Sequence, residues 1–300
     1  MVKKQLIHLW NLKNRSRDYI PAKKFLSYTQ QEVEKINKGH FNYPIYNWML
    51  IIDEYILTFS NCYMSYNQDN SKLSKQDLVL KIMIGALAGH LNAVKSLTLA
   101  GFDIQAKILA RMISEHVDLI ISMKFNPDLC EEFHAAANDG TENTFWNKKV
   151  SKRKLRAGIK TAVELQHPDL IDAWKDINTY VTTEEEILGK TVHPSYIASA
   201  LVNFSGPSLG GGGLGFFGLI GPWSSNTLQF INCRIFEMLL LCKDNITRSV
   251  LDNFDVKSPV PKSDIVDTVD YISLVSFCFL WIGPHIRDLN FEFEDETIEN

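Results

Sequence analysis

The chain has few cysteines, and none of them stands in a pattern that binds metal or builds a disulfide framework. Its 300 residues include five cysteines, an odd number, and no two of them form C-x-x-C. Zinc sites and disulfide-rich secreted domains need closely spaced or evenly paired cysteines. We therefore expect free thiols in a reducing compartment and predict a cytoplasmic protein. The cysteines are Cys62, Cys130, Cys233, Cys242 and Cys278.

The sequence also lacks an excess of positive charge and any long hydrophobic run. A net charge of −4 gives no attraction of the whole protein to nucleic acid or anionic lipid. The most apolar stretch, Tyr271–Gly283, is shorter than the roughly 20 residues that cross a bilayer, so we expect a buried helix there. The first residues, MVKKQLIHLWNLKNRS, contain no apolar region of signal-peptide length. We expect no membrane insertion.

Motifs for metals and cofactors are absent or incomplete. The chain has no H-E-x-x-H, and Glu131 and His134 form a single E-x-x-H without the second copy found in di-iron bundles. The run Gly210–Gly215 formally contains G-x-G-x-x-G, but no clear strand precedes it and no βαβ pattern surrounds it. We therefore predict neither a metal ion nor a cofactor, and interpret this glycine-rich segment as a loop or lid.

Helical patterns fill the chain, and no series of segments alternates polar and apolar residues as half-buried strands do. We predict an all-α fold in a single domain spanning 1–300, with its core at about 74–204. N-terminal helices at 19–65 precede this core, and C-terminal helices at 225–285 follow the glycine-rich loop at 205–224. The best-defined helices are expected from Ser74 to Ala100, Phe102 to Phe125, Thr144 to Leu165, His167 to Val181 and Thr227 to Phe254.

The segment Phe102–Phe125 has the clearest helical period and concentrates ionisable residues within an apolar run. Asp103 is expected to cap this helix. Arg111 and Glu115 lie one turn apart, and His116 falls near the middle of the apolar face. Two interpretations are open: a surface ion pair beside a core histidine, or a buried polar site kept for chemistry.

A basic stripe follows on the helix predicted at 144–165. Between Asn147 and Ala162 the chain has seven lysines and arginines and no acid. Residues four apart share one helix face, which could follow a phosphate backbone, with Trp146 stacking on a base at one end. The alternative is an ordinary solvated helix face. The predicted RNA-binding residues are Lys148, Lys152, Arg153, Arg156 and Lys160, with Lys149 and Lys154 beside them.

The spacing R-x-x-x-x-H occurs at Arg111 and His116. It resembles the signature of HEPN ribonucleases (higher eukaryote and prokaryote nucleotide-binding domains). The resemblance implies a HEPN-like helical bundle that forms a homodimer, with the two motifs facing each other across the interface. An arginine and a histidine so placed could cleave RNA without metal, because the histidine moves the proton of the 2′-hydroxyl and the arginine stabilises charge at the phosphorus.

A second resemblance runs from about Lys81 to Leu201. It rests on Phe102-Asp103, on Ala110-Arg111 with Glu115, on Pro127 with Phe133, and on the segment Leu188–Ser195. These residues resemble a group of uncharacterised bacterial all-helical proteins placed with the HEPN-like and abortive-infection families. The resemblance implies that Arg111, Glu115 and His193 form one polar cluster.

Two functional hypotheses follow from these patterns. The first is a HEPN-like protein that binds RNA, or cleaves it without metal, in prokaryotic defence. Arg111 would stabilise phosphate charge, Glu115 would hold Arg111, and His116 or His193 would act as acid and base. The second is a non-catalytic helical scaffold or sensor in which Arg111, Glu115 and His193 form a buried structural network. The expected partners are RNA, a second copy of the chain and a partner protein from the same operon.

Overall fold

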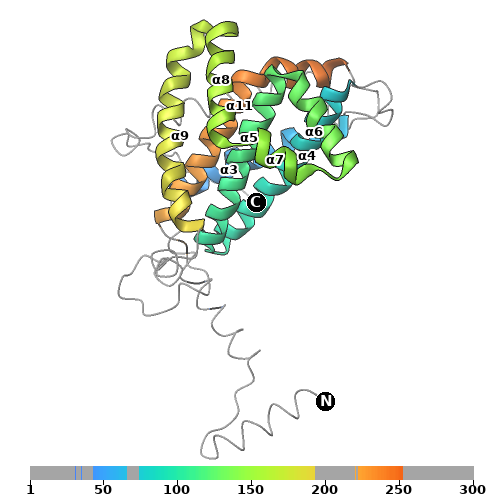
Figure 1. Cartoon of the computed structure of the whole chain (residues 1–300). Helices are drawn as coiled ribbons and strands as arrows, with labels where there is room; N and C mark the ends of the chain where they lie inside the picture. Colours follow the sequence, from blue (N-terminus) through green and yellow to red (C-terminus); the bar gives the residue numbers. More distant parts are fainter. Residues whose placement is uncertain are drawn as a thin grey trace, which may run out of the picture.

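The computed structural model describes residues 31, 35, 43–65, 74–192, 220 and 222–252, and every regular element within them is a helix (Figure 1). The predicted all-α class is therefore confirmed for this part of the chain. The elements are α3 (Tyr43–Ser65), α4 (Lys75–Leu99), α5 (Asp103–Phe125), α6 (Pro127–Asp139), α7 (Glu142–Lys149), α8 (Lys152–Gln166), the 3₁₀ turn η2 (Pro168–Leu170), α9 (Ile171–Val192) and α11 (Pro222–Asp252).

Helix α5 is the centre of the bundle, since α4, α6, α8, α9 and α11 all pack against it (Figure 1). The hairpin that places α4 beside α5 has local causes. The hydroxyl of Ser74 caps α4 by accepting a hydrogen bond from the Asp77 backbone N–H at 3.1 Å. The turn into α5 is made by Gly101, whose φ of 73° is a left-handed conformation that favours glycine. Helix α3 packs on α4 and α11 and closes the core.

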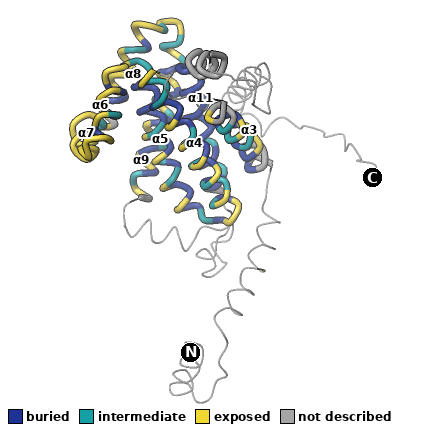
Figure 2. Tube along the Cα trace, turned by 90° about the vertical axis from the view of Figure 1, so that its right-hand side faces the viewer, coloured by how far each residue is buried: buried dark blue, intermediate teal, exposed yellow. Residues whose placement is uncertain are grey.

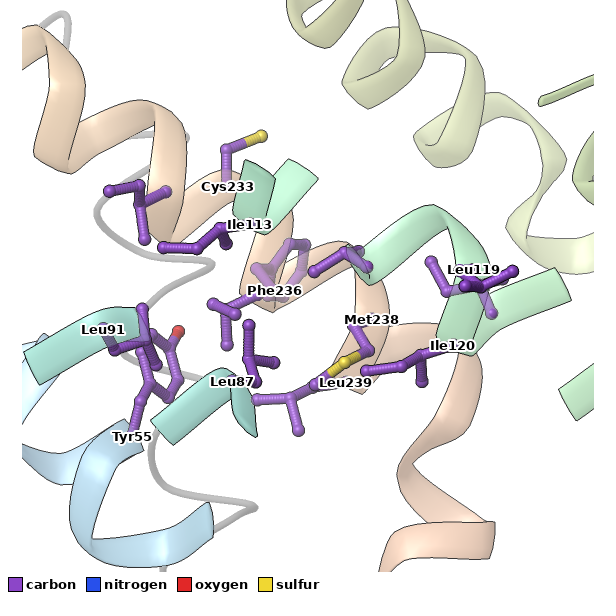
Figure 3. Close-up of a cluster of buried hydrophobic side chains, with 14 of the residues drawn as sticks. Tyr55, Leu87, Leu91, Ile113, Leu119, Ile120, Cys233, Phe236, Met238 and Leu239 are labelled. Atoms are coloured by element: carbon purple, nitrogen blue, oxygen red, sulfur yellow. The ribbon is translucent and has the colours of Figure 1, made fainter. Parts of the chain in front are cut away.

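The hydrophobic core joins helices that are distant in the sequence (Figure 2). Side chains from α3, α4, α5 and α11 meet in one cluster (Figure 3). Its labelled members are Tyr55, Leu87, Leu91, Ile113, Leu119, Ile120, Cys233, Phe236, Met238 and Leu239. Helices α3 and α11 therefore contribute side chains to the same hydrophobic core as residues 74–192.

Close approach of α3 to α4 depends on a glycine. A Cβ atom added to Gly85 would lie 2.6 Å from Cδ2 of the Tyr63 ring, which is too close for two carbon atoms. Lys81, one turn before Gly85, has its ammonium 5.5 Å from the centroid of the same ring. The small residue at position 85 thus makes room for an aromatic side chain from the neighbouring helix.

The structure corrects the predicted helix from Thr144 to Leu165. The chain instead forms α7 and α8, separated at Val150 and Ser151. The cause is a cap: the Ser151 hydroxyl accepts from the backbone N–H of Lys154 at 3.4 Å and so starts a new helix. Residues on the two sides of this break do not continue one regular stripe.

Two further boundary predictions were wrong. Helix α9 does not end near Val181 but continues to Val192. The Thr183 hydroxyl donates to the Thr179 carbonyl at 3.0 Å, a bond that a threonine makes inside a helix, so this residue does not cap a new one. Asp103 does not cap α5 either, because the cap position is Phe102 and Asp103 is the buried first residue of the helix.

Several predicted segments lie outside the described residues. They include most of the glycine-rich loop at 205–224, of which Ile220 is buried, and His193 with the residues that follow it. The apolar stretch Tyr271–Gly283 also lies outside them. Among the described helices, α4 alone is long and apolar enough to cross a membrane by length and composition. Half of its most apolar window is buried inside the bundle, and core helices meet the same two criteria.

Candidate functional site

Arg111 and Glu115 form an ion pair on the solvent side of α5. The Arg111 Nε donates to Glu115 Oε1 at 3.1 Å, and the two side chains are 37% and 48% exposed. This is the i,i+4 geometry that neighbouring turns of a helix allow. The pair matches the surface ion pair among the two sequence interpretations, and it is not part of a buried network.

His116 turns away from this pair toward α4. Its Nε2 lies 3.0 Å from the carbonyl oxygen of Met83, and its ring contacts His90 edge to face with centroids 5.7 Å apart. Burial lowers the pKa of His116 to about 4, an effect that the Met83 hydrogen bond partly offsets. The imidazole is therefore neutral at physiological pH. Within the described part of the chain, no hydrogen bond or ion pair joins Arg111 to His116. His193, the other predicted acid–base residue, lies outside the described residues.

The exposed cations of the basic segment gather where α7 meets α8. We call Lys148, Lys149, Arg153 and Lys154 the basic corner. All four side chains are exposed, and α7 lies at the edge of the bundle (Figure 2). The Lys154 ammonium donates to the Lys148 carbonyl at 2.8 Å and ties the start of α8 to the end of α7. Lys149 pairs with Glu132 at 3.0 Å, which ties α7 to α6.

Most of the basic corner has no acidic partner. Across the described ranges, no ion pair involves Lys148, Arg153 or Lys154. Lys160, which was predicted to extend the stripe, is exposed one to two turns further along α8 and faces Glu164 at 3.7 Å. The side chain of Lys152 lies outside the described ones. The positive charge is thus concentrated at the corner and does not run evenly along one helix.

Arg156 was predicted to bind RNA on the exposed stripe, and the structure corrects this assignment. Its side chain is buried, because its position on α8 shares the face of Ile159 and Val163 that packs on α5. The guanidinium donates to Asp118 at 3.0 Å and to Glu237 at 2.6 Å. An arginine held in this way does not reach a phosphate at the surface.

Arg156 belongs to a buried ionic network that sequence reasoning missed. The second guanidinium is that of Arg234 on α11, which is fully buried and bonds to Asp118 and Glu237. Its Nη2 also donates to the Ser114 carbonyl at 3.1 Å. Burial alone would lower the pKa of Arg234, but the carboxylates of Asp118 and Glu237 raise it above its usual value. The network therefore holds two cations and two anions that compensate each other.

Side chains of α9 complete the network. Trp174 on α9 donates its indole N–H to Glu237 Oε1 at 2.9 Å, and its ring lies 5.3 Å from the Arg156 guanidinium carbon. Asn178, one turn later, accepts from Arg156 at 2.6 and 3.0 Å. On the same helix, Glu185 accepts from the Ser114 hydroxyl. These contacts join α5, α8, α9 and α11 through hydrogen bonds that are buried at Glu237 and Ser114 and half-buried at Asn178.

The buried ionic network and the exposed basic corner differ in what they can do chemically. The ionic network pairs its cations and anions with one another inside the bundle, and among the described residues Arg234 Nε has no hydrogen-bond partner. Its role is therefore structural. The basic corner is exposed and can meet a polyanion. Among the described residues, no group of three or more histidine, cysteine, aspartate or glutamate side chains could hold a metal ion.

Comparison with known proteins adds no assignment. No protein-family model, no curated protein and no solved structure matches this chain.

Proposed function

We propose that this protein binds RNA without cleaving it, and that the basic corner is the binding surface. The observation that carries the proposal is the exposure of Lys148, Arg153 and Lys154 without an acidic partner among the described residues. Cations of this kind attract a phosphate backbone and release its counterions, which favours binding. Because the net charge is −4, this attraction is local to the corner.

The buried network supports this proposal because it holds α8, the helix that carries Arg153 and Lys154, in place. Arg156 lies within one turn of Arg153 and Lys154 on α8, and its guanidinium is held by Asp118 of α5 and Glu237 of α11. A surface whose groups are already positioned loses less conformational entropy when it binds. In this proposal the helical bundle positions the corner, and the residues of its buried network differ from the Arg111, Glu115 and His193 of the second sequence hypothesis.

The placement of the predicted catalytic residues favours binding over cleavage. A histidine with a pKa of about 4 is a weak base at neutral pH, and His116 already bonds to a backbone carbonyl. Arg111 is held by Glu115 on another side of the helix. Cleavage by Arg111, Glu115, His116 and His193 stays the alternative prediction. We also keep four other expectations as predictions: a homodimer, a partner protein from the same operon, a cytoplasmic location and a role in defence.

The test is RNA affinity measured by fluorescence anisotropy over a range of salt concentrations. The variant Lys148→Ala/Arg153→Ala removes two cations of the corner, and Lys75→Ala/Lys175→Ala removes two exposed lysines elsewhere. If both corner side chains contact phosphates, the plot of log binding constant against log salt concentration should be shallower in this variant than in the wild type, by about 1.4 in slope for single-stranded RNA. The control variant should keep the wild-type slope. Equal affinity and slope in all three proteins would overturn the proposal.

A cleavage assay with the same RNA separates the two hypotheses. Wild type, Arg111→Ala and His116→Ala are each incubated with end-labelled RNA in the presence of a metal chelator. We expect intact RNA in all three reactions. Cleavage by the wild type that disappears in both variants would support the metal-independent ribonuclease instead.

A further inference from the structure

Trp146 on α7 is an aromatic residue that reaches solvent. It is 41% exposed, whereas Trp48 and Trp174 are buried in the bundle. The preceding residue explains its direction. Phe145 is buried against Phe133, with ring centroids 5.5 Å apart, and neighbouring helix positions point about 100° apart. Anchoring of Phe145 therefore turns the indole of Trp146 outward.

The indole and the cations belong to one braced unit. Lys149 lies three residues after Trp146 and so extends from the same side of α7. The Trp146 carbonyl accepts from the backbone N–H of Val150 at 3.1 Å, which closes α7 at the corner. From there the Lys154 ammonium reaches back to the Lys148 carbonyl at 2.8 Å. These two bonds tie the end of α7, which carries the indole, to the start of α8, which carries Arg153 and Lys154.

This combination discriminates between forms of nucleic acid. A base offers its flat face to an aromatic ring only when it is unpaired or unstacked, because a double helix covers both faces of each base. Lysines next to the ring then attract the flanking phosphates. We propose that the basic corner takes single-stranded RNA, with an unpaired base stacked on Trp146 and the adjoining phosphates at the cations of the corner. This inference rests on the proposed RNA-binding function and names its substrate class.

The test compares an unstructured single-stranded RNA with a duplex of the same length at one salt concentration. Wild type should bind the single strand about tenfold more tightly, and Trp146→Ala should remove most of this preference while leaving duplex affinity unchanged. Trp146→Phe should restore most of the single-strand affinity, since phenylalanine also stacks. Leu165→Ala removes another exposed apolar side chain, on α8, and should behave as wild type.

Fluorescence gives a second reading of the same contact. Stacking on Trp146 should quench indole emission when the single strand is added to the wild type, and the quenching should be absent in Trp146→Phe. Equal binding of both RNA forms, unchanged in Trp146→Ala, would overturn the inference and leave the proposed function intact. Absence of binding to either RNA would overturn the proposed function, and the inference would fall with it.

Discussion

Replacing Arg234 by methionine should destabilise the protein far more than the same change at Arg111. Arg234 is fully buried and bonds to both acids of the network. Without it, Asp118 and Glu237 would share only the charge of Arg156. Removing one partner of a buried ion pair costs about 3–5 kcal/mol, because the other charge stays buried without compensation. Glu185, a third acid close enough to Arg234 to raise its pKa, adds to this loss.

Glu237→Gln should also destabilise the protein. Its amide oxygen can still accept from Trp174 and Arg156, but its NH2 group takes the place of the oxygen that accepts from Arg234, so two buried arginines lose one carboxylate. This loss should also be about 3–5 kcal/mol. In the double variant Arg234→Met/Glu237→Gln, one cation and one anion remain, namely Arg156 and Asp118. The combined loss should therefore be smaller than the sum of the single losses by at least about 1 kcal/mol.

Urea unfolding followed by circular dichroism measures these differences in the full chain. Arg111→Met is the matched control, because it removes an arginine from an exposed pair. Exposed pairs contribute only about 0.2–1 kcal/mol, so this variant should unfold close to the wild-type midpoint. Equal midpoints for Arg234→Met and Arg111→Met would refute the argument from burial. Strictly additive losses in the double variant would refute the claim that Arg234 and Glu237 compensate each other.

The helices themselves could largely be predicted because their signals are local. Ser74 and Gly101 mark ends that the structure retains, and apolar periodicity marks α4 and α5. The break at Val150 was missed since neither glycine nor proline stands there, and a serine cap alone decides it. The end of α9 was placed at Val181 because Thr182 or Thr183 was expected to cap a new helix. Threonine also bonds within helices, and the sequence does not distinguish the two uses.

The ionic network could not be predicted because its partners are remote in the sequence. Arg156 is 38 residues from Asp118 and 81 from Glu237, and no period or motif connects such positions. A signal was present at the other arginine, since Arg234 and Glu237 interrupt the apolar run Phe230–Cys242 one turn apart. Charges inside such a run need partners, although the run does not say which helix supplies them.

Two other predictions concern acid titration and helix packing. The folded pKa of His116, about 4, is below its unfolded value of 6.5, so its contribution to stability is complete above pH 6.5 and is lost as pH falls toward 4. Burial raises the pKa of Asp103 to about 6 despite a hydrogen bond from Ser224, so its contribution is complete below pH 3.8 and is lost as pH rises through 6. Between pH 4 and 6 these two contributions to stability change in opposite directions. On acidification, Asp103→Asn should therefore lose more stability than the wild type, and His116→Gln should lose less, as measured by urea unfolding at several pH values. Parallel curves of stability against pH for the three proteins would contradict both assignments. For packing, Gly85→Ala should destabilise the protein by about 1–3 kcal/mol through contact with Tyr63, whereas Gly89→Ala, with nothing within 4 Å of the added carbon, should stabilise α4 by about 0.5–1 kcal/mol. Thermal melts of the two variants check this, and equal shifts in Tm would contradict it.

The cations of α8 follow one another closely in the sequence, but they have different surroundings. Acidic residues on other helices contact some of these cations and not others. Arg156 lies on the face of α8 that packs on α5, and Asp118 of α5 and Glu237 of α11 supply the acidic partners that a buried guanidinium needs. Arg153 and Lys154 form no ion pair with an acidic side chain among the described residues, and both are exposed to solvent. Arg156 shares a buried face of α8 with Ile159 and Val163, and this packing leaves Arg153 and Lys154 on exposed positions of the same helix. Sequence spacing alone does not show which of these cations finds acidic partners on other helices.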